Sequence, residues 1–252
     1  MLIRLQKLIA DRGYCSRRKA EQYILDGKVK VDGIVVRELG NKFEDSKVTV
    51  EIDGTVLKPI SNPKKYYFLV NKPCGFITSL SDDRGRKTVD KLIPPKYGRL
   101  FPVGRLDINT SGALIMTNDG DFANLVMHPS SSFNKTYTVE VSGRFTSLDK
   151  NRLERGIMLE DGLTSPAKVE ILSVSTTYSK INITIHEGRN REVRRMMEAL
   201  NHRVISLMRI KIGNMSVAKL KTGQYAQIPE NIIESIRKKC LYNKEHNTYK
   251  KL

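Results

Sequence analysis

The sequence RLFPVGRLDINTSGALIMTN, residues 99–118, is the most informative stretch of this 252-residue chain. Apolar runs at 100–103 and 113–116 flank a polar segment, DINTSG, at 107–112. Short apolar runs bounded by turn residues are typical of buried strands. Asx and Ser side chains followed by glycine are typical of a turn. The stretch therefore predicts two strands of a sheet joined by a polar turn.

Two charged residues of this stretch, Arg105 and Asp107, are candidates for a functional site. They are two positions apart, so on an extended segment their side chains point to the same side. The pattern predicts a carboxylate and a guanidinium together at the mouth of a sheet, where loops commonly carry chemistry. The alternative is that Asp107 only caps a turn beside Asn109. This stretch alone leaves both interpretations open.

The composition favours a globular protein that binds a polyanion. The formal net charge is +17, and such a charge opposes folding by self-repulsion unless a polyanionic partner offsets it. Nucleic acid is the simplest such partner, and a membrane surface is the alternative. The sequence contains neither an apolar stretch of about 18 residues nor a signal peptide. We therefore expect no membrane association.

The sequence predicts neither a metal site nor a bound cofactor. Its three cysteines, Cys15, Cys74 and Cys240, form neither a disulfide framework nor a metal-binding motif, which suits the reducing cytoplasm. The four histidines have no HExxH spacing, and no glycine-rich nucleotide-binding loop follows a predicted strand. We therefore expect a cytoplasmic protein without metal or cofactor.

The first 60 residues predict a small module of two helices and two hairpins. Apolar spacing predicts a helix over 2–13, and Ser16 is a good N-cap for a second helix that ends near Asp26. Asp-Gly pairs at 32–33 and 53–54 predict hairpin turns. Three cations crowd the first turn of the second helix, where the helix dipole disfavours them and where phosphate can bind: Arg17, Arg18 and Lys19.

The segment SRRKAEQYILDGKVKVDG, residues 16–33, resembles the alpha-L RNA-binding domain. The resemblance implies that this module binds RNA, and the alternative is a small α+β adaptor with a solvated basic face. We expect the RNA contacts of the module to come from Arg4, Lys7, Arg17, Arg18 and Lys19.

A second, larger domain follows a polar, proline-containing segment. Strands are predicted near 66–70, 134–141, 167–174 and 180–186, and a helix is predicted at 191–200. The apolar face of this helix is Val193, Met196, Met197 and Leu200, and its other side carries Arg191, Arg194 and Arg195. Residues 186–221 contain nine Lys or Arg and three Asp or Glu, which favours a polyanion-binding surface over a solvated face with balanced charges.

Four segments of this larger domain resemble the motifs of one enzyme family. They are NKPCG at 71–75, GRLDINTSG at 104–112, KTYTV at 135–139 and EGRNREVRRM at 187–196. Together they resemble pseudouridine synthases of the RsuA/RluB/RluE/RluF family, and most closely the RluB-type enzymes of large-subunit ribosomal RNA. The resemblance covers nearly the whole chain, apart from its C-terminal tail and the length of the loop at 79–87.

The resemblance implies an α+β fold with four parts. An alpha-L module at 1–60 is joined by a linker at 61–65 to a synthase domain at 66–239, and a basic, disordered tail follows at 240–252. The synthase domain is expected to contain a mixed, mainly antiparallel sheet flanked by helices.

The family also implies an activity, the isomerisation of uridine to pseudouridine in ribosomal RNA without a cofactor, and a role for each motif residue. Asp107 is the essential carboxylate, which Arg194 keeps ionised by pairing with it. Tyr137 lies against the target base, and Arg105 contacts a phosphate or orients the nucleotide. We expect further RNA contacts from Arg189, Arg191 and Arg195. The expected partner is ribosomal RNA or a pre-ribosomal particle, bound by a monomer.

Other functions are compatible with a basic chain of this kind. The same reaction could take place on small-subunit ribosomal RNA. A non-catalytic RNA-binding or ribosome-assembly protein would use the alpha-L module as its anchor, and its synthase motifs would then be coincidental. An RNA methyltransferase would need a glycine-rich cofactor loop after a strand, which the sequence lacks. Convergence of Asp107 and Arg194 in one cleft would favour the synthase.

Overall fold

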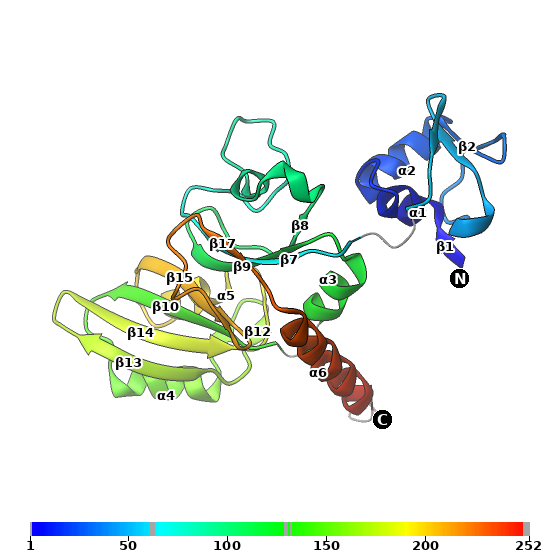
Figure 1. Ribbon diagram of the computed structural model, residues 1–252. Coiled ribbons are helices and arrows are strands. Elements are labelled where there is room, and N and C mark those ends of the chain that lie inside the picture. Colours follow the sequence, from blue (N-terminus) through cyan, green and yellow to red (C-terminus); the bar gives the residue numbers. More distant parts are fainter. Residues whose placement is uncertain (1, 61–63, 129–130, 132, 249–252) are drawn as a thin grey trace. The chain divides into compact units, whose positions relative to one another are not determined.

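The chain folds into two compact units, residues 1–64 and 65–252 (Figure 1). The computed structural model describes residues 2–60, 64–128, 131 and 133–248, and for residues 244–248 only the backbone. Most of the predicted linker, residues 61–63, lies outside the described residues. Within the described ranges, no helix has the length and apolar character needed to cross a membrane.

The first unit is built from two helices and short antiparallel strands. Its sheet has the order β3-β2-β5-β6, and β1 pairs separately with β4. Both predicted hairpins are confirmed, and Asp32 and Asp53 adopt positive φ angles at their turns. The elements are β1 (Leu2–Arg4), α1 (Leu5–Asp11), α2 (Arg17–Leu25), β2 (Val29–Val31), β3 (Ile34–Val36), β4 (Lys42–Glu44), β5 (Val50–Ile52) and β6 (Thr55–Leu57).

The start of this unit corrects one sequence prediction. Residues 2–4 were expected to begin a helix, but they form strand β1 against β4, and α1 starts only at Leu5. Backbone pairing with a distant strand therefore outweighs the local helical spacing, which is a weak preference. The prediction for Ser16 is confirmed, since its side chain accepts a hydrogen bond from the backbone N–H of Lys19.

The second unit contains a large mixed sheet, mainly antiparallel as predicted. In the described residues the strand order is β13-β14-β10-β15-β9-β7-β17, with β8 on β9 and β16 on β15. The strands are β7 (Tyr67–Lys72), β8 (Phe101–Val103), β9 (Ser111–Thr117), β10 (Lys135–Ser142), β13 (Lys168–Val174), β14 (Tyr178–Ile185), β15 (Val204–Ile212), β16 (Met215–Ser216) and β17 (Tyr225–Gln227); a separate hairpin joins β11 (Met158–Leu159) to β12 (Gly162–Leu163).

Helices cover both faces of this sheet (Figure 1). Alternate residues of the central strands point to opposite faces, so that Leu114 of β9 joins one apolar cluster and Ile115 joins the other. Helices α4 (Ser147–Arg155) and α5 (Glu192–Glu198) belong to the first cluster, and helices α3 (Gly120–Met127) and α6 (Glu230–Thr248) belong to the second. The predicted apolar face of α5 is confirmed, because Val193, Met196 and Met197 are all buried.

Strands β9 and β15 form the parallel pair that joins the two halves of the sheet. Ser111 lies opposite Met208, and Gly112 lies opposite Arg209. Gly112 has a φ of +104°, and a Cβ atom there would lie 2.1 Å from the carbonyl oxygen of Arg209. Only glycine fits this close backbone contact.

The C-terminal residues correct a second prediction. A short helix over 231–239 and a disordered tail from residue 240 were expected, but α6 continues to Thr248. Cys240 is fully buried in the apolar cluster, and the Asn243 side chain donates to the carbonyl oxygen of Ser131 over 3.0 Å. These contacts stabilise a segment that has no proline or glycine to end the helix. Residues 249–252 lie outside the described residues.

Gly112→Ala tests the β9–β15 contact. Positive φ and a backbone clash act together, so we expect a loss of about 2–5 kcal/mol in the free energy of unfolding. Gly143→Ala is the control, because Gly143 has a φ of +78° with no atom near its Cβ position. It should lose only about 1–2 kcal/mol. Urea unfolding of both variants measures the difference, and equal losses would contradict the clash.

Candidate active site

The loop between β8 and β9 presents the predicted carboxylate. Leu106 is buried, and its backbone N–H and C=O both hydrogen-bond the hydroxyl of Thr78, over 3.1 Å and 2.7 Å. The backbone N–H of Thr110 donates to the carbonyl oxygen of Asp107 over 3.0 Å and closes the predicted turn. The side chains of Arg105 and Asp107, on either side of Leu106, remain accessible and both line one pocket.

This pocket has a volume of about 420 Å³ and lies between the loop, strands β10 and β15, and the start of α5. It brings together predicted site residues that come from three separate segments of the chain. Its lining includes Arg105, Asp107, Thr110, Tyr137, Leu207, and the turn and helix residues Gly188, Arg189, Asn190, Arg191, Glu192, Val193 and Arg194. Carboxylate, tyrosine and arginines therefore converge as the motifs predicted.

The arginines around Asp107 differ in one respect from the prediction. Arg194 was expected to pair with Asp107, but its guanidinium donates to the carbonyl oxygen of Asn109 over 2.7 Å. In the described residues the ion pair of Asp107 is with Arg191, at 3.9 Å. The two arginines lie three residues apart at the start of α5. Arg191 forms the ion pair with the Asp107 carboxylate, and Arg194 binds the backbone of the loop that carries Asp107. Burial, followed by repulsion from Arg191, lowers the pKa of Arg194, and attraction to Asp107 opposes this shift.

Tyr137 forms part of the inner wall of the pocket, on strand β10. It is buried, and its hydroxyl lies 3.5 Å from Nη1 of Arg209, a buried residue of the neighbouring strand β15. The Arg209 guanidinium also donates from Nε to the carbonyl oxygen of Ala113 over 2.7 Å. The tyrosine ring is thus held in place by a cation that spans β9, β15 and β10.

A buried lysine, Lys72, contributes charge close to Asp107. Its side chain is fully buried, and its ammonium donates to the carbonyl oxygens of Pro73 and Phe76 over 2.9 Å and 2.7 Å. Burial lowers the pKa of Lys72 to about 8, and attraction to Cys74 and to Asp107 partly offsets this shift. Lys72 belongs to the NKPCG motif, from which no role for this lysine was predicted. A charged residue at the end of an otherwise apolar strand was the available signal.

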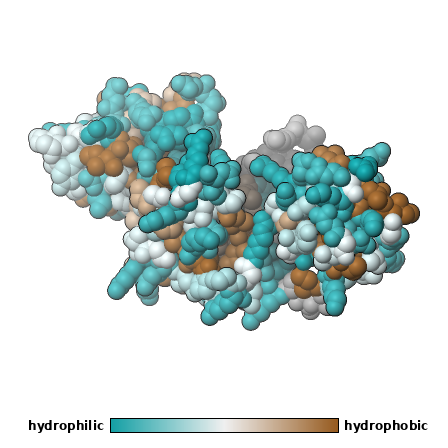
Figure 2. Space-filling view, turned by 90° about the horizontal axis from the view of Figure 1, so that it is seen from above, coloured by the Kyte–Doolittle hydropathy of each residue, from teal (hydrophilic) through white to brown (hydrophobic). Residues whose placement is uncertain are grey.

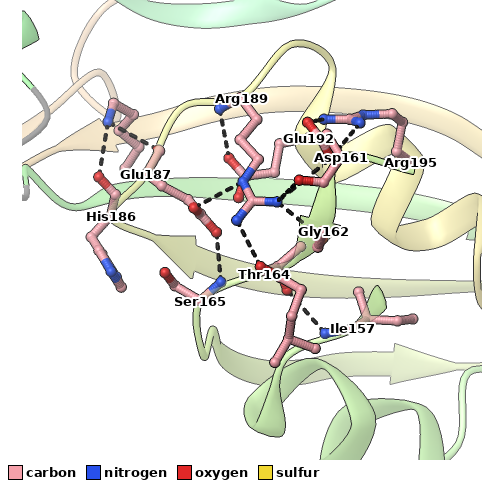
Figure 3. Close-up of polar contacts among 12 residues, drawn as sticks. Ile157, Asp161, Gly162, Thr164, Ser165, His186, Glu187, Arg189, Glu192 and Arg195 are labelled. Carbon is pink, nitrogen blue, oxygen red and sulfur yellow. Dashed lines mark hydrogen bonds and ion pairs between the residues drawn. The ribbon is translucent and has the colours of Figure 1, made fainter. Parts of the chain in front are cut away.

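Two of the other predicted RNA contacts, Arg189 and Arg195, are engaged within the protein. Both form ion pairs with Asp161, at 3.5 Å and 2.9 Å (Figure 3). Arg189 also pairs with Glu187 at 3.0 Å and donates to the carbonyl oxygens of Gly162 and Leu163. These contacts hold the turn before α5 against the β11–β12 hairpin.

The predicted cations of the first unit lie mostly at its surface. Arg4, Arg17, Arg18 and Lys19 are exposed, and Lys7 pairs with Asp11 at 3.1 Å. Ser16 caps the helix that carries the cluster at 17–19.

No group of three His, Cys, Asp or Glu in the described residues is arranged to hold a metal ion.

A pocket lined by a carboxylate, a tyrosine and arginines, in a chain of strong positive charge, is typical of an enzyme that modifies RNA. Residues 66–199 match the family model described as RNA pseudouridylate synthase, and residues 3–44 match that of the S4 domain.

Individual relatives extend this similarity over almost the whole chain. A Bacillus subtilis (strain 168) protein named ribosomal large subunit pseudouridine synthase B is 46% identical, covering 93% of this chain and 95% of the relative. An uncharacterized RNA pseudouridine synthase of Aquifex aeolicus (strain VF5) is 41% identical over 94% of this chain and 95% of its own. A crystal structure of a pseudouridylate synthase is 31% identical with a TM-score of 0.67, covering 93% of this chain and 99% of that one.

The chain belongs to the RNA pseudouridylate synthase family, in its RsuA-type branch with an N-terminal S4 RNA-binding domain. It is therefore an isomerase, and the predicted enzyme class is confirmed. The S4 match likewise confirms the predicted alpha-L module.

Lys72→Met tests the buried charge. The pKa of Lys72 is about 8 in the folded protein and near 10.5 in the unfolded chain, so the unfolded state binds more protons between these values. Wild-type stability relative to the variant should therefore rise with pH from 8 to 10, by up to about 1.4 kcal/mol per pH unit. Urea unfolding at several pH values measures this. Lys91→Met removes an exposed lysine as a control and should show no such slope.

Proposed function

We propose that this chain converts uridine to pseudouridine in ribosomal RNA, specifically large-subunit RNA, with Asp107 as the essential carboxylate. The observation that carries the proposal is the placement of Asp107 in one pocket with Tyr137, Arg191 and Arg194. The large-subunit assignment is supported by the similarity over 93% of the chain to a relative named as a large-subunit enzyme.

The reaction requires an anion close to the glycosidic bond. Uracil must leave C1′ of the ribose through N1 and rejoin it through C5, with no net change in oxidation state. A carboxylate can act as a nucleophile or can stabilise positive charge on the sugar, as in glycosidases. Asp107 provides this group, and the guanidinium of Arg191 lies 3.9 Å from its carboxylate.

The other pocket residues have complementary roles in this proposal. Tyr137 provides an aromatic face against the uracil, because stacking holds a base without requiring a particular hydrogen-bond pattern. Arg105 is exposed beside Asp107 and contacts a phosphate or orients the nucleotide. Arg194 acts through the loop backbone at Asn109, and so fixes the position from which Asp107 reaches the sugar.

The positive surface supports the binding of folded RNA. A uridine must leave its stack to enter the pocket, at a cost of roughly a few kcal/mol, and phosphate contacts compensate for it. In the view of Figure 2, hydrophilic residues cover most of the visible face. We assign phosphate contacts to Arg4, Lys7, Arg17, Arg18 and Lys19 of the S4 domain, and to Arg191 near the pocket.

A non-catalytic RNA-binding protein is less consistent with this pocket. Such a protein would have no need for a carboxylate enclosed with a tyrosine and two arginines, because phosphate binding alone is opposed by a negative charge. Asp107 and Arg194 do line the same pocket, which is the arrangement that favours the synthase.

Asp107→Asn tests the central proposal. The amide keeps the size and the backbone turn, so a purely structural role predicts a stability loss on the order of 1 kcal/mol or less. An amide cannot supply the anion, so we expect normal folding and RNA affinity but no detectable pseudouridine. Melting temperature, RNA affinity and pseudouridine yield are measured on one preparation, with large- and small-subunit RNA as substrates.

Asp83→Asn is the matched control, because Asp83 is an exposed loop carboxylate and its variant should retain full activity. Near-normal yield from a folded Asp107→Asn protein would refute the catalytic role. Preferential modification of small-subunit RNA by the wild-type protein would overturn the large-subunit assignment.

Replacing Arg17, Arg18 and Lys19 with alanine tests the S4 surface. Each lost phosphate contact should reduce the slope of log affinity against log salt by about 0.7–0.9, while the melting temperature changes little. Filter binding or fluorescence anisotropy over a range of salt concentrations measures the slope. The control replaces two exposed cations of α4 in the other unit, Arg152 and Arg155. A triple variant with the wild-type slope would contradict a phosphate-binding role.

A further inference from the structure

Glu192, the first residue of α5, is a buried acid that the proposed reaction does not use directly. It is only 3% exposed. One carboxyl oxygen, Oε2, accepts a hydrogen bond from the backbone N–H of Arg189 over 3.1 Å. The other, Oε1, is buried and has no donor among the described residues. A buried carboxylate oxygen without a donor is costly, whereas a protonated carboxyl needs an acceptor instead.

The carboxyl group of Glu192 interacts with that of Glu187, and both carboxyl groups bind Arg189. The backbone N–H of Ser165 and the Nε–H of Arg189 already donate to Glu187, over 2.6 Å and 3.0 Å, so its charge is well stabilised (Figure 3). Two carboxyl groups can share a hydrogen bond only if one of them keeps its proton. Burial and the hydrogen bond to Glu187 raise the pKa of Glu192 to about 7.

The charged groups around this pair come from every neighbouring element. Arg189 belongs to the same turn, Arg195 to the same helix, and Lys135 to strand β10. Asp161 of the β11–β12 hairpin lies beyond them and neutralises the two arginines. Burial, followed by repulsion from Arg209, lowers the pKa of Lys135.

The turn that this pair closes carries the cation of the active site. Arg191, at the N-cap of α5, has a φ of +48°, a conformation that non-glycine residues rarely adopt, and from it the guanidinium reaches Asp107. Lys135 binds the carbonyl oxygens of His186 and Glu187 from one side of the turn. On the other side, the carboxyl groups of Glu187 and Glu192 both bind Arg189, at its Nε–H and at its backbone N–H. Glu192 itself makes no contact with Asp107 in the described structure.

We propose that Glu192 is a positioning residue of the synthase: its neutral carboxyl donates a hydrogen bond to Glu187 and holds the turn that directs Arg191 to Asp107. The proposal rests on the proposed role of Asp107. When Glu192 loses its proton, two buried carboxylates face each other, their repulsion opens the turn, and Arg191 and Arg194 no longer occupy the geometry for catalysis. Activity therefore falls as the pH rises through about 7.

The effect on stability has a defined sign. The pKa of Glu192 is about 7 in the folded protein and near 4.5 in the unfolded chain, so the folded state binds more protons between these values. Stability from this group is fully present below pH 4.5 and is lost as the pH rises towards 7. Glutamine at this position keeps a hydrogen-bond donor at every pH and removes the titration.

Glu192→Gln provides the decisive comparison. Single-turnover rates of pseudouridine formation on an rRNA transcript are measured from pH 5.5 to 8.5 for wild type, Glu192→Gln and Glu192→Ala. We expect the glutamine variant to match wild type near pH 6 and to exceed it by up to about tenfold at pH 8, where about one tenth of wild type is protonated at this site. The alanine variant should be slow throughout. Glu198→Gln, an exposed acid of the same helix, should follow wild type.

A constant ratio of glutamine-variant to wild-type rate across this pH range would overturn the proposal, as would a glutamine variant as slow as the alanine variant.

Two readouts do not depend on Asp107. The melting temperature of wild type relative to Glu192→Gln should fall from pH 5 to 7. Carbon-13 NMR of glutamate-labelled wild type should show a carboxyl that titrates near pH 7, and its absence would refute the shared proton even if no variant folds. An active Asp107→Asn protein would instead refute the proposed function alone.

Discussion

The close parallel contact between β9 and β15 is the constraint on which the active site depends. Gly112 permits the backbones to meet opposite Arg209, and the buried guanidinium of Arg209 links β9 through Ala113 to Tyr137 on β10. The loop with Asp107 directly precedes β9. The contact therefore brings Asp107, on the loop before β9, and Tyr137, on β10, to the same pocket, although β9 and β10 are not neighbours in the sheet.

A second layer of interactions sorts the many cations of this region into separate roles. Asp161 and Glu187 neutralise Arg189 and Arg195, which then serve to hold the turn before α5. Arg191 and Arg194 are left at the pocket, one toward the Asp107 carboxylate and one on its loop. Not all of the positive charge is therefore available to bind RNA. Arg189 and Arg195 form ion pairs within the domain and stabilise its fold.

Local patterns in the sequence were reliable where the deciding contacts are local. The cap at Ser16, the Asp-Gly hairpins and the apolar face of α5 each depend on residues within a few positions of one another. Predictions were wrong where a distant segment intervened. Pairing with β4 turns residues 2–4 into a strand, and packing of Cys240 against the sheet extends α6 to Thr248.

The sequence by itself determined the family, the motif residues of the pocket and the positive charge that suits an RNA substrate, because these depend on which residues are present and at what spacing. Only the tertiary structure decided which arginine pairs with Asp107, and that Lys72, Arg209 and Glu192 are buried ionisable groups beside the site. The physical reason is that burial and pairing of charge depend on distances across strands and turns remote in sequence. Side-chain spacing along one helix or strand carries no information about those distances.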